Sequence, residues 1–108
     1  MEADAMELYE LKAGVLAAIA HPLRLAVLDV LSDGEVCVCD IAERVGAKRS
    51  NISRHLAVML SAGILASRKE GLQVFYSLRT PCILGSLDCV VNVLREQMSH
   101  QNALLKRL

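Results

Sequence analysis

The stretch that decides most of the fold is AKRSNISRHLAVMLSAGILASRKEGLQVFYSL, residues 47–78. In its first half, apolar residues recur at helical spacing, which predicts a helix from about 49 to 61 that is closed by Gly63. These apolar residues are Ile52, Leu56, Met59 and Leu60. The second half changes to a period of two on either side of a Glu70-Gly71 turn, as expected for an antiparallel hairpin. The alternating positions are Leu65, Ser67 and Lys69, then Leu72, Val74 and Tyr76.

Further helices are predicted on both sides of this stretch. One covers residues 5–20, with Leu8, Leu11, Val15 and Ala18 on its inward face, and it ends before Pro22. A second runs over 22–31, with Leu23, Ala26, Val27, Val30 and Leu31 inward, and a third over 38–45, with Ile41, Ala42 and Val45 inward and Gly46 as its stop. A last helix begins at Thr80-Pro81 and carries Ile83, Leu87, Val90, Val91, Leu94 and Met98, with Leu104, Leu105 and Leu108 as its extension. Two short helices joined by a tight turn and followed by a hairpin describe a winged helix-turn-helix, mainly α with a small β-hairpin.

The size of the chain predicts one domain over residues 1–108, and a core so modest that a homodimer is plausible. We expect the N- and C-terminal helices to form the dimer contact. The acidic start MEADAMELYE lacks the order of a signal peptide, and no apolar run reaches the ~20 residues that span a bilayer. We therefore expect a cytoplasmic protein without a membrane partner, whose cysteines stay reduced.

Charge is distributed unevenly, although the net charge is zero. Residues 44–79 hold seven Lys or Arg against one acid, which gives +6, and the remainder holds five bases and eleven acids, which gives −6. A basic middle indicates a face that meets the phosphates of double-stranded DNA. The predicted DNA contacts are Lys48, Arg49, Ser50, Asn51, Ser53 and Arg54 of the second helix of the motif, with Ala57 on the same face, and Arg68 and Lys69 of the hairpin. The alternative is an ordinary solvated helix face.

Two cysteines, Cys37 and Cys39, stand where the helix over 38–45 begins. A thiol is a poor substitute for the oxygen of a helix cap, and Cys37-x-x-Asp40 resembles a capping box with sulfur in place of the hydroxyl. The partial positive charge of a helix start favours thiolate, which selects soft metal ions. Two such thiolates can share an ion if the backbone there is extended or only entering a helix. The alternative is that both are small buried apolar residues.

Residues 21–78 resemble the ArsR/SmtB family of dimeric winged-helix repressors. SRHLAVMLSAGIL and EGLQVFYSL are similar to its recognition helix and wing, and EVCVCDIAERV is similar to the thiolate sensor motif of its arsenic- and cadmium-responsive members. One departure is Lys48, which stands where a Ser cap is expected before the recognition helix.

The resemblance implies that Cys37 and Cys39 bind As(III) or Sb(III) as inducer, with Cd(II), Pb(II) or Zn(II) as further candidates. Arsenite-type ions take three thiolates, and the position where some arsenic sensors of the family carry the third is Ala42 here. Cys82 or Cys89, from the same chain or the dimer partner, could complete the site instead. The stretch CVVNVLREQMSH lacks the His-x-x-His pair of the family's zinc sensors, so a nitrogen–oxygen zinc site is not expected.

The function that these patterns predict is a metal(loid)-responsive transcriptional repressor, which binds operator DNA as a dimer and is released when the thiolates capture an ion. A redox- or persulfide-responsive repressor of the same fold is the first alternative, and a Cd- or Pb-responsive repressor is the second. A protein-interaction module without DNA is a third. An enzyme is not expected, because Cys-x-Cys is not the Cys-x-x-Cys of thiol oxidoreductases and neither a base nor an oxyanion device is recognisable.

Overall fold

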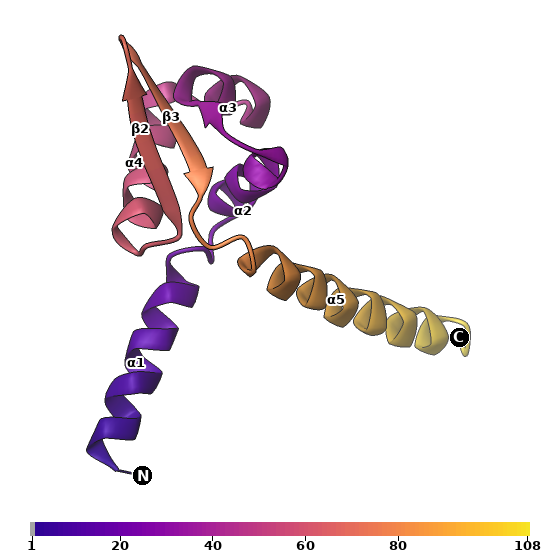
Figure 1. The fold of residues 1–108 in the computed structure, drawn as a ribbon. Helices are drawn as coiled ribbons and strands as arrows, with labels where there is room; N and C mark the ends of the chain where they lie inside the picture. Colours follow the sequence, from indigo (N-terminus) through magenta and orange to yellow (C-terminus); the bar gives the residue numbers. More distant parts are fainter. Residues whose placement is uncertain (1) are drawn as a thin grey trace.

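The computed structural model describes residues 2–108, and its elements follow the predicted order with additions. They are α1 (Ala3–Ala17), α2 (Pro22–Val30), the short 3₁₀ helix η1 (Leu31–Asp33), β1 (Val36–Cys37), α3 (Val38–Val45), α4 (Arg49–Ser61), β2 (Leu65–Glu70), β3 (Gln73–Leu78) and α5 (Ile83–Leu105). Helices α2, α3 and α4 and the sheet form one unit, from which α1 and α5 leave in different directions (Figure 1). We call residues 18–78 the winged domain and α1 and α5 its arms.

The core of the winged domain lies where α2, α3 and α4 meet. Its fully buried side chains are Val27, Leu28, Leu31, Ile41, Ile52, Leu56, Met59 and Leu65. The inward positions predicted for α3 and α4 are confirmed, with the exception of Leu60, which is exposed. Leu28 was not among the predicted inward positions, and it is buried while its neighbours Ala26 and Val30 are only half-buried. The three-helix core therefore holds α4, the predicted recognition helix, by its buried face and leaves the opposite face exposed.

The boundaries of α3 and α4 are confirmed, and local chemistry explains them. Gly46 follows α3 with a φ of +78°, and the N–H groups of Gly46 and Ala47 bond to the carbonyl of Ala42. A left-handed residue of this kind ends a helix, and glycine adopts that conformation without strain. Lys48 precedes α4 in an extended conformation and makes no side-chain cap bond. The two helices are thus joined by a three-residue turn, 46–48.

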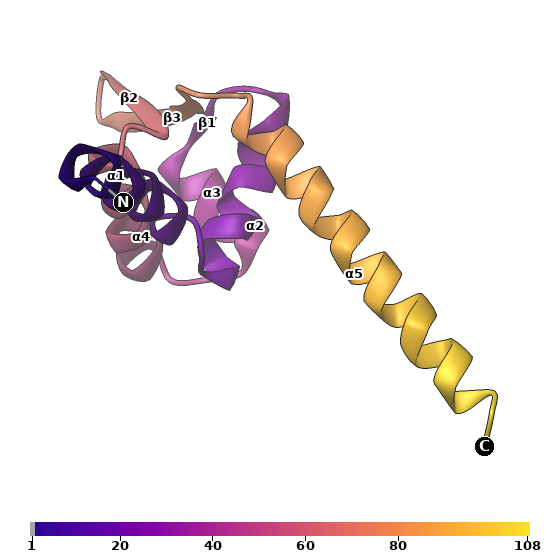
Figure 2. The ribbon, with the colours of Figure 1, turned by 90° about the horizontal axis from the view of Figure 1, so that it is seen from below.

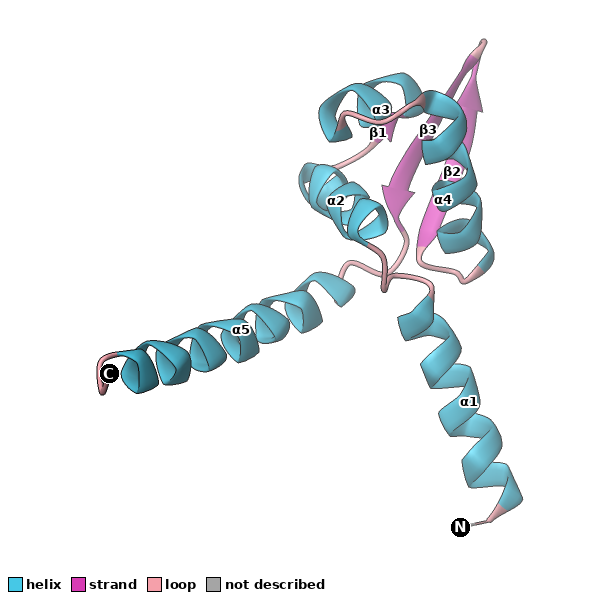
Figure 3. Cartoon of the chain, turned by 180° about the vertical axis from the view of Figure 1, so that it is seen from behind, coloured by secondary structure: helices cyan, strands magenta, loops and turns pink. Residues whose placement is uncertain are grey.

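The predicted hairpin is present, but two details of it are corrected. First, β1 adds a third strand, so that the antiparallel sheet has the order β1-β3-β2, with Cys37 opposite Phe75 (Figure 3). Second, Glu70 pairs with Gln73, so the turn consists of Gly71 and Leu72 rather than of Glu70 and Gly71. Gly71 has a φ of +62°, which suits the first position of a two-residue hairpin turn. Leu72 is consequently 95% exposed at the wing tip instead of alternating within a strand.

The arms differ most from the sequence-based expectation. The predicted inward residues of α1, Leu8, Leu11 and Val15, are exposed, and only Ala18 beyond the helix end is buried. Helix α1 also ends earlier than predicted, at Ala17. In Figure 2 α5 extends well clear of the winged domain. Within residues 2–108, no individual helix is long and apolar enough to cross a membrane, and only α1 with Pro22–Asp33 meets that test as a pair, bent by 76° at the break.

Helix α5 starts two residues later than predicted and ends at Leu105, short of Leu108. The residue before the helix is Cys82, which makes no side-chain cap bond, and the Thr80 hydroxyl instead donates to the carbonyl of Gly63 (3.3 Å). Ile83, Leu84 and Leu87 pack against the core of the winged domain. From Val90 onward the predicted inward residues are exposed, namely Val90, Val91, Leu94 and Met98.

Candidate DNA interface and thiol pair

The exposed face of α4 carries the predicted DNA-reading residues. Arg49, Ser50, Ser53, Arg54 and Ala57 are all exposed, opposite the face that Ile52, Leu56 and Met59 bury. Asn51 is half-buried, and its Oδ1 accepts a hydrogen bond from Nη2 of Arg54 (3.1 Å). Asn51 would use the same oxygen to read adenine, so Arg54 and a base would share this acceptor. This hydrogen bond holds Arg54 on the exposed face of α4.

The start of α4 combines two sources of positive charge. Lys48 and Arg49 stand at its first positions and are exposed, and the Lys48 side chain does not cap the helix. The free N–H groups of the first turn add the partial positive charge of a helix start. This combination is a suitable partner for a DNA phosphate. Figure 3 shows α4 lying across one side of the sheet with this end toward the wing.

The wing holds one of its two predicted cations in an ion-pair network. The Arg68 guanidinium donates to both carboxylate oxygens of Glu35 (2.6–2.9 Å) and to Glu70 (2.8 Å), and it lies 4.7 Å from the ring centroid of Phe75. The hydrogen bond from Arg68 lowers the pKa of Glu35, and the same bond raises the pKa of Arg68. Among residues 2–108 these are the only ion pairs, so Lys69 carries uncompensated charge on the wing. DNA contact by Arg68 stays a prediction, and Glu35 and Glu70 would compete with a phosphate for its guanidinium.

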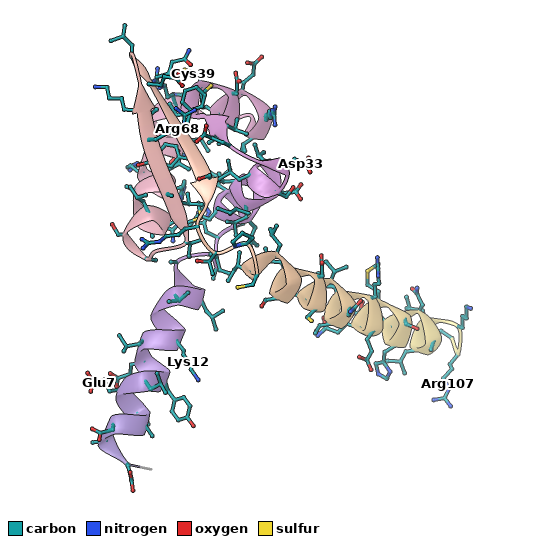
Figure 4. The ribbon with its side chains drawn as sticks, viewed as in Figure 1. Glu7, Lys12, Asp33, Cys39, Arg68 and Arg107 are labelled. Carbon is teal, nitrogen blue, oxygen red and sulfur yellow. The ribbon has the colours of Figure 1, made fainter. Side chains whose placement is uncertain are left out.

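The two sulfurs of the thiol pair have different environments. Cys37 ends β1 and precedes α3 with φ −75° and ψ 154°, and it makes no side-chain cap bond. Its side chain is only 9% exposed, whereas Cys39 in the first turn of α3 is exposed. Cys37 is therefore extended and Cys39 helical, which is the backbone arrangement under which two thiolates one residue apart can share an ion. In Figure 4 Cys39 lies at the end of the winged domain that is remote from the arms.

The structure does not bring a third ligand to this pair. Cys82 precedes α5 and Cys89 lies within it, and both are exposed. Helix α5 leaves the winged domain at the end opposite to Cys39 (Figure 4). Among residues 2–108, no three His, Cys, Asp or Glu side chains are grouped so that they could hold a metal ion. The same-chain arrangement considered from the sequence is thus absent from this conformation, and completion of the site by a dimer partner stays a prediction.

A cluster of His21, Arg24 and His55 was not expected from the sequence. The rings of His21 and His55 lie 4.4 Å apart, and Arg24 donates from Nε to Nδ1 of His55 (3.1 Å) and from Nη1 to the carbonyl of Ala18 (3.3 Å). Burial lowers the pKa of His55, and the charges of His21, Arg24 and Arg54 lower it further. Local pattern gives no signal for this cluster, because Arg24 and His55 are 31 residues apart and meet only when α2 packs on α4.

A three-helix core, an exposed basic recognition helix and a hairpin wing define a winged helix-turn-helix transcriptional regulator. The family model described as "Bacterial regulatory protein, arsR family" matches residues 21–67. A relative from Mycobacterium tuberculosis, the HTH-type transcriptional regulator Rv0081, is 34% identical over 102 residues, which cover 94% of this chain and 90% of the relative. The chain belongs to the ArsR family, and it is a transcriptional regulator rather than an enzyme.

Solved structures and a further relative extend this similarity. The crystal structure of Rv0081 superposes with a TM-score of 0.76 over 87% of this chain and 95% of that chain, at 34% identity. A homodimeric winged helix-turn-helix DNA-binding domain from Mycobacterium bovis, described as a possible ArsR-family regulator, gives a TM-score of 0.78 at 28% identity, with 93% of each chain covered. The arsenical resistance operon repressor of Escherichia coli is 41% identical over 61 residues, which are 56% of this chain and 52% of that repressor.

Proposed function

We propose that this chain is a homodimeric repressor that binds operator DNA and releases it when Cys37 and Cys39 capture As(III) or Sb(III). The observation that carries the proposal is the position of the two sulfurs, one residue apart, where β1 passes into α3, the first helix of the helix-turn-helix. The similarity to an arsenical resistance repressor over 61 residues supports arsenic as the signal. Cd(II) and Pb(II) are the other soft ions that two thiolates would accept.

The different exposure of the two sulfurs suggests an order of capture. Cys39 is exposed and meets the ion first, and Cys37, at the edge of the core, follows by turning outward. Turning Cys37 outward disturbs β1, because Cys37 is paired with Phe75 in β3. Ion capture would therefore act on the wing and on α3 together. The third ligand of a trigonal arsenic site would come from Cys82 or Cys89 of the partner protomer.

Glu35 gives the thiol segment a second connection to the wing. It lies two residues before Cys37 and binds Arg68 of β2 through both carboxylate oxygens. A shift of β1 on ion capture would therefore move a wing arginine as well as the backbone of β3. Transmission through such a packed and hydrogen-bonded segment needs only two alternative arrangements of that segment.

The homodimer is supported by the exposed apolar side chains of both arms and by the homodimeric state of the M. bovis structure. Two recognition helices about 34 Å apart would enter successive major grooves of an inverted repeat. The coupling between ion and DNA is reciprocal, so DNA lowers the ion affinity by the same factor by which the ion lowers DNA affinity.

The experiment compares Cys37→Ser and Cys39→Ser with Cys82→Ser and Cys89→Ser. An operator duplex is first selected from random-sequence DNA with the wild-type protein, and its release by arsenite is then followed by fluorescence anisotropy under anaerobic, fully reduced conditions. We expect both of the first variants to bind the duplex normally and to lose release at arsenite concentrations that release the wild type. Loss in only one of the last two variants would identify the third ligand.

Two results would contradict the arsenic proposal. Normal release of both Cys37→Ser and Cys39→Ser would remove the thiol pair from sensing. Release by an oxidant or polysulfide, with no stoichiometric uptake of arsenite, antimonite, cadmium or lead by the reduced protein, would instead establish the redox repressor.

A further inference from the structure

A shallow depression of about 270 Å³ lies between α2 and the recognition helix α4. Its lining consists of Arg24 from α2 and of Asn51, Arg54, His55 and Val58 from α4. Arg54 also belongs to the exposed face predicted to read DNA, so the depression borders that face directly. It is separate from the thiol pair, which lies on β1 and α3.

The depression is positively charged, because its arginines have only neutral partners. Arg24 donates to the Nδ1 atom of His55 and to the carbonyl of Ala18, and Arg54 donates to the amide oxygen of Asn51. Among the residues that the structure describes, the only ion pairs are those of Arg68 on the wing. Arg68 is neutralised by two carboxylates, whereas the charges of Arg24 and Arg54 are available to bind an external anion.

Hydrogen bonds to His55 and to the carbonyl of Ala18 hold Arg24 in place, and a hydrogen bond to Asn51 holds Arg54. His21 accepts from the N–H of Leu23 at Nδ1 (3.1 Å), and His55 accepts from Arg24 at Nδ1 (3.1 Å). The Nδ1 atom of His55 carries no proton while it accepts this bond, so the guanidinium of Arg24 faces an uncharged acceptor. Arg24 has five N–H donors, and two of them are used by His55 and Ala18, so three are left to bind a ligand.

We propose that this depression binds a backbone phosphate of duplex DNA, with Arg24 as its principal ligand and Arg54 as the second. The inference rests on the DNA binding in the proposed function and extends the contact surface from α4 to α2. Guanidinium groups bind phosphate oxygens through two parallel hydrogen bonds, and a pre-positioned guanidinium loses little conformational freedom on binding. A phosphodiester is the expected anion because the recognition helix brings the DNA backbone alongside.

The test measures the salt dependence of binding to a mixed-sequence duplex, because nonspecific binding depends on phosphate contacts alone. Arg24→Gln is expected to weaken binding about tenfold at about 0.1 M salt. It should also lower the slope of log K against log [salt] by about one for each subunit bound. Arg24→Lys keeps the positive charge but cannot make both hydrogen bonds to His55 and Ala18. It is expected to keep the wild-type slope of log K against log [salt]. Arg107→Gln, at the far end of the C-terminal arm (Figure 4), is the matched control and should change neither quantity.

A second pair of variants leaves Arg24 and its hydrogen bonds to His55 and Ala18 unchanged. Val58 lines the depression and is partly exposed, so it can be replaced without opening the core. Val58→Glu places a carboxylate beside the two arginines and is expected to weaken DNA binding at least as much as Arg24→Gln, whereas Val58→Gln alters the same lining without a charge and is expected to weaken binding less.

The possible results separate failure of the phosphate site from failure of the DNA-binding proposal. Equal binding and equal slopes for the wild type, Arg24→Gln and Val58→Glu would overturn the phosphate site but leave the DNA-binding proposal intact. Equal losses of affinity and slope in Arg24→Lys and Arg24→Gln would also overturn it, because the role of Arg24 would then be structural. Failure of the wild-type protein itself to bind duplex DNA in a salt-dependent manner would overturn the proposed function and the phosphate site together.

Discussion

The winged domain and its two arms contain similar apolar residues but place them differently. Among residues 2–108, every fully buried side chain lies in the winged domain, between Val27 and Leu65, whereas α1 and α5 contain at most partly buried residues. Leu11 and Leu94, for example, are 64% and 53% exposed. A helix that keeps such a row of apolar side chains in water lacks most of the stabilisation that burial provides. The comparison indicates that the winged domain is stabilised by its own core, and we expect a second protomer to cover the apolar faces of the arms.

The largest expected effect tests the core side of this comparison. Leu56→Ala removes a fully buried side chain from α4 and leaves a cavity among α2, α3 and α4. Substitutions of this kind cost about 2–5 kcal/mol, which is a large part of the stability of a small domain. Leu60→Ala is the matched control, because Leu60 lies on the same helix and is exposed, and it should cost less than about 1 kcal/mol. Urea unfolding followed by circular dichroism measures both, and similar costs for the two variants would contradict the assignment of the core.

The second prediction concerns the arms. Leu11→Glu in α1 and Leu94→Glu in α5 place a charge on faces that we expect a second protomer to cover. Burying an unpaired carboxylate is unfavourable, so each variant should raise the dimer dissociation constant about 100-fold or more. Sedimentation analysis measures the association, and circular dichroism at matched concentration checks that the winged domain stays folded. The control is Glu96→Gln, which changes the charge on α5 without introducing one.

A wild-type protein that stays monomeric at high concentration would contradict this prediction outright. Dimers that tolerate both substitutions would place the contact elsewhere on the molecule.

The sequence predicted the winged domain better than the arms, and the reason is physical. Helices α3 and α4 have local stops and a periodic buried face, so their bounds could be predicted to the residue. The two residues of β1 are too few to show a period, and their strand exists only because β3 pairs with them. Periodicity shows that α1 and α5 have an apolar face, but it does not show which chain covers that face.

In the candidate site, too, the features set by local spacing were predicted and the contacts set by tertiary packing were not. The exposed basic face of α4 and the thiol pair at the start of α3 follow from spacing within one segment, and both lie where the sequence predicted. The partners that fix the arginines do not follow from spacing. Arg68 meets Glu35 across 33 residues, and Arg24 meets His55 across 31. Such contacts are a result of tertiary packing, so the sequence predicted the cations but not which of them are neutralised.

The smallest expected effect tests the junction where the N-terminal arm joins the winged domain. Arg24 links Ala18, at the end of α1, to His55 of α4. Burial lowers the pKa of His55 from its ordinary 6.5, and His21, Arg24 and Arg54 lower it further. The unfolded chain therefore binds a proton at this histidine more readily than the folded protein. As the pH falls from about 7.5 through the ordinary histidine pKa of 6.5, His55 takes up a proton in the unfolded chain first, and this reduces the free energy of unfolding.

His55→Gln removes the titration but keeps an acceptor that Arg24 can use. We expect its free energy of unfolding, from urea titrations at about pH 7.5 and about pH 5.5 and at one protein concentration, to change less with pH than that of the wild type. The control is His100→Gln, which replaces an exposed histidine of α5 remote from the junction. A wild-type protein whose stability falls no more steeply than that of His55→Gln would show that His55 is equally ready to take a proton in both states. The link between α1 and α4 would then not depend on a neutral imidazole.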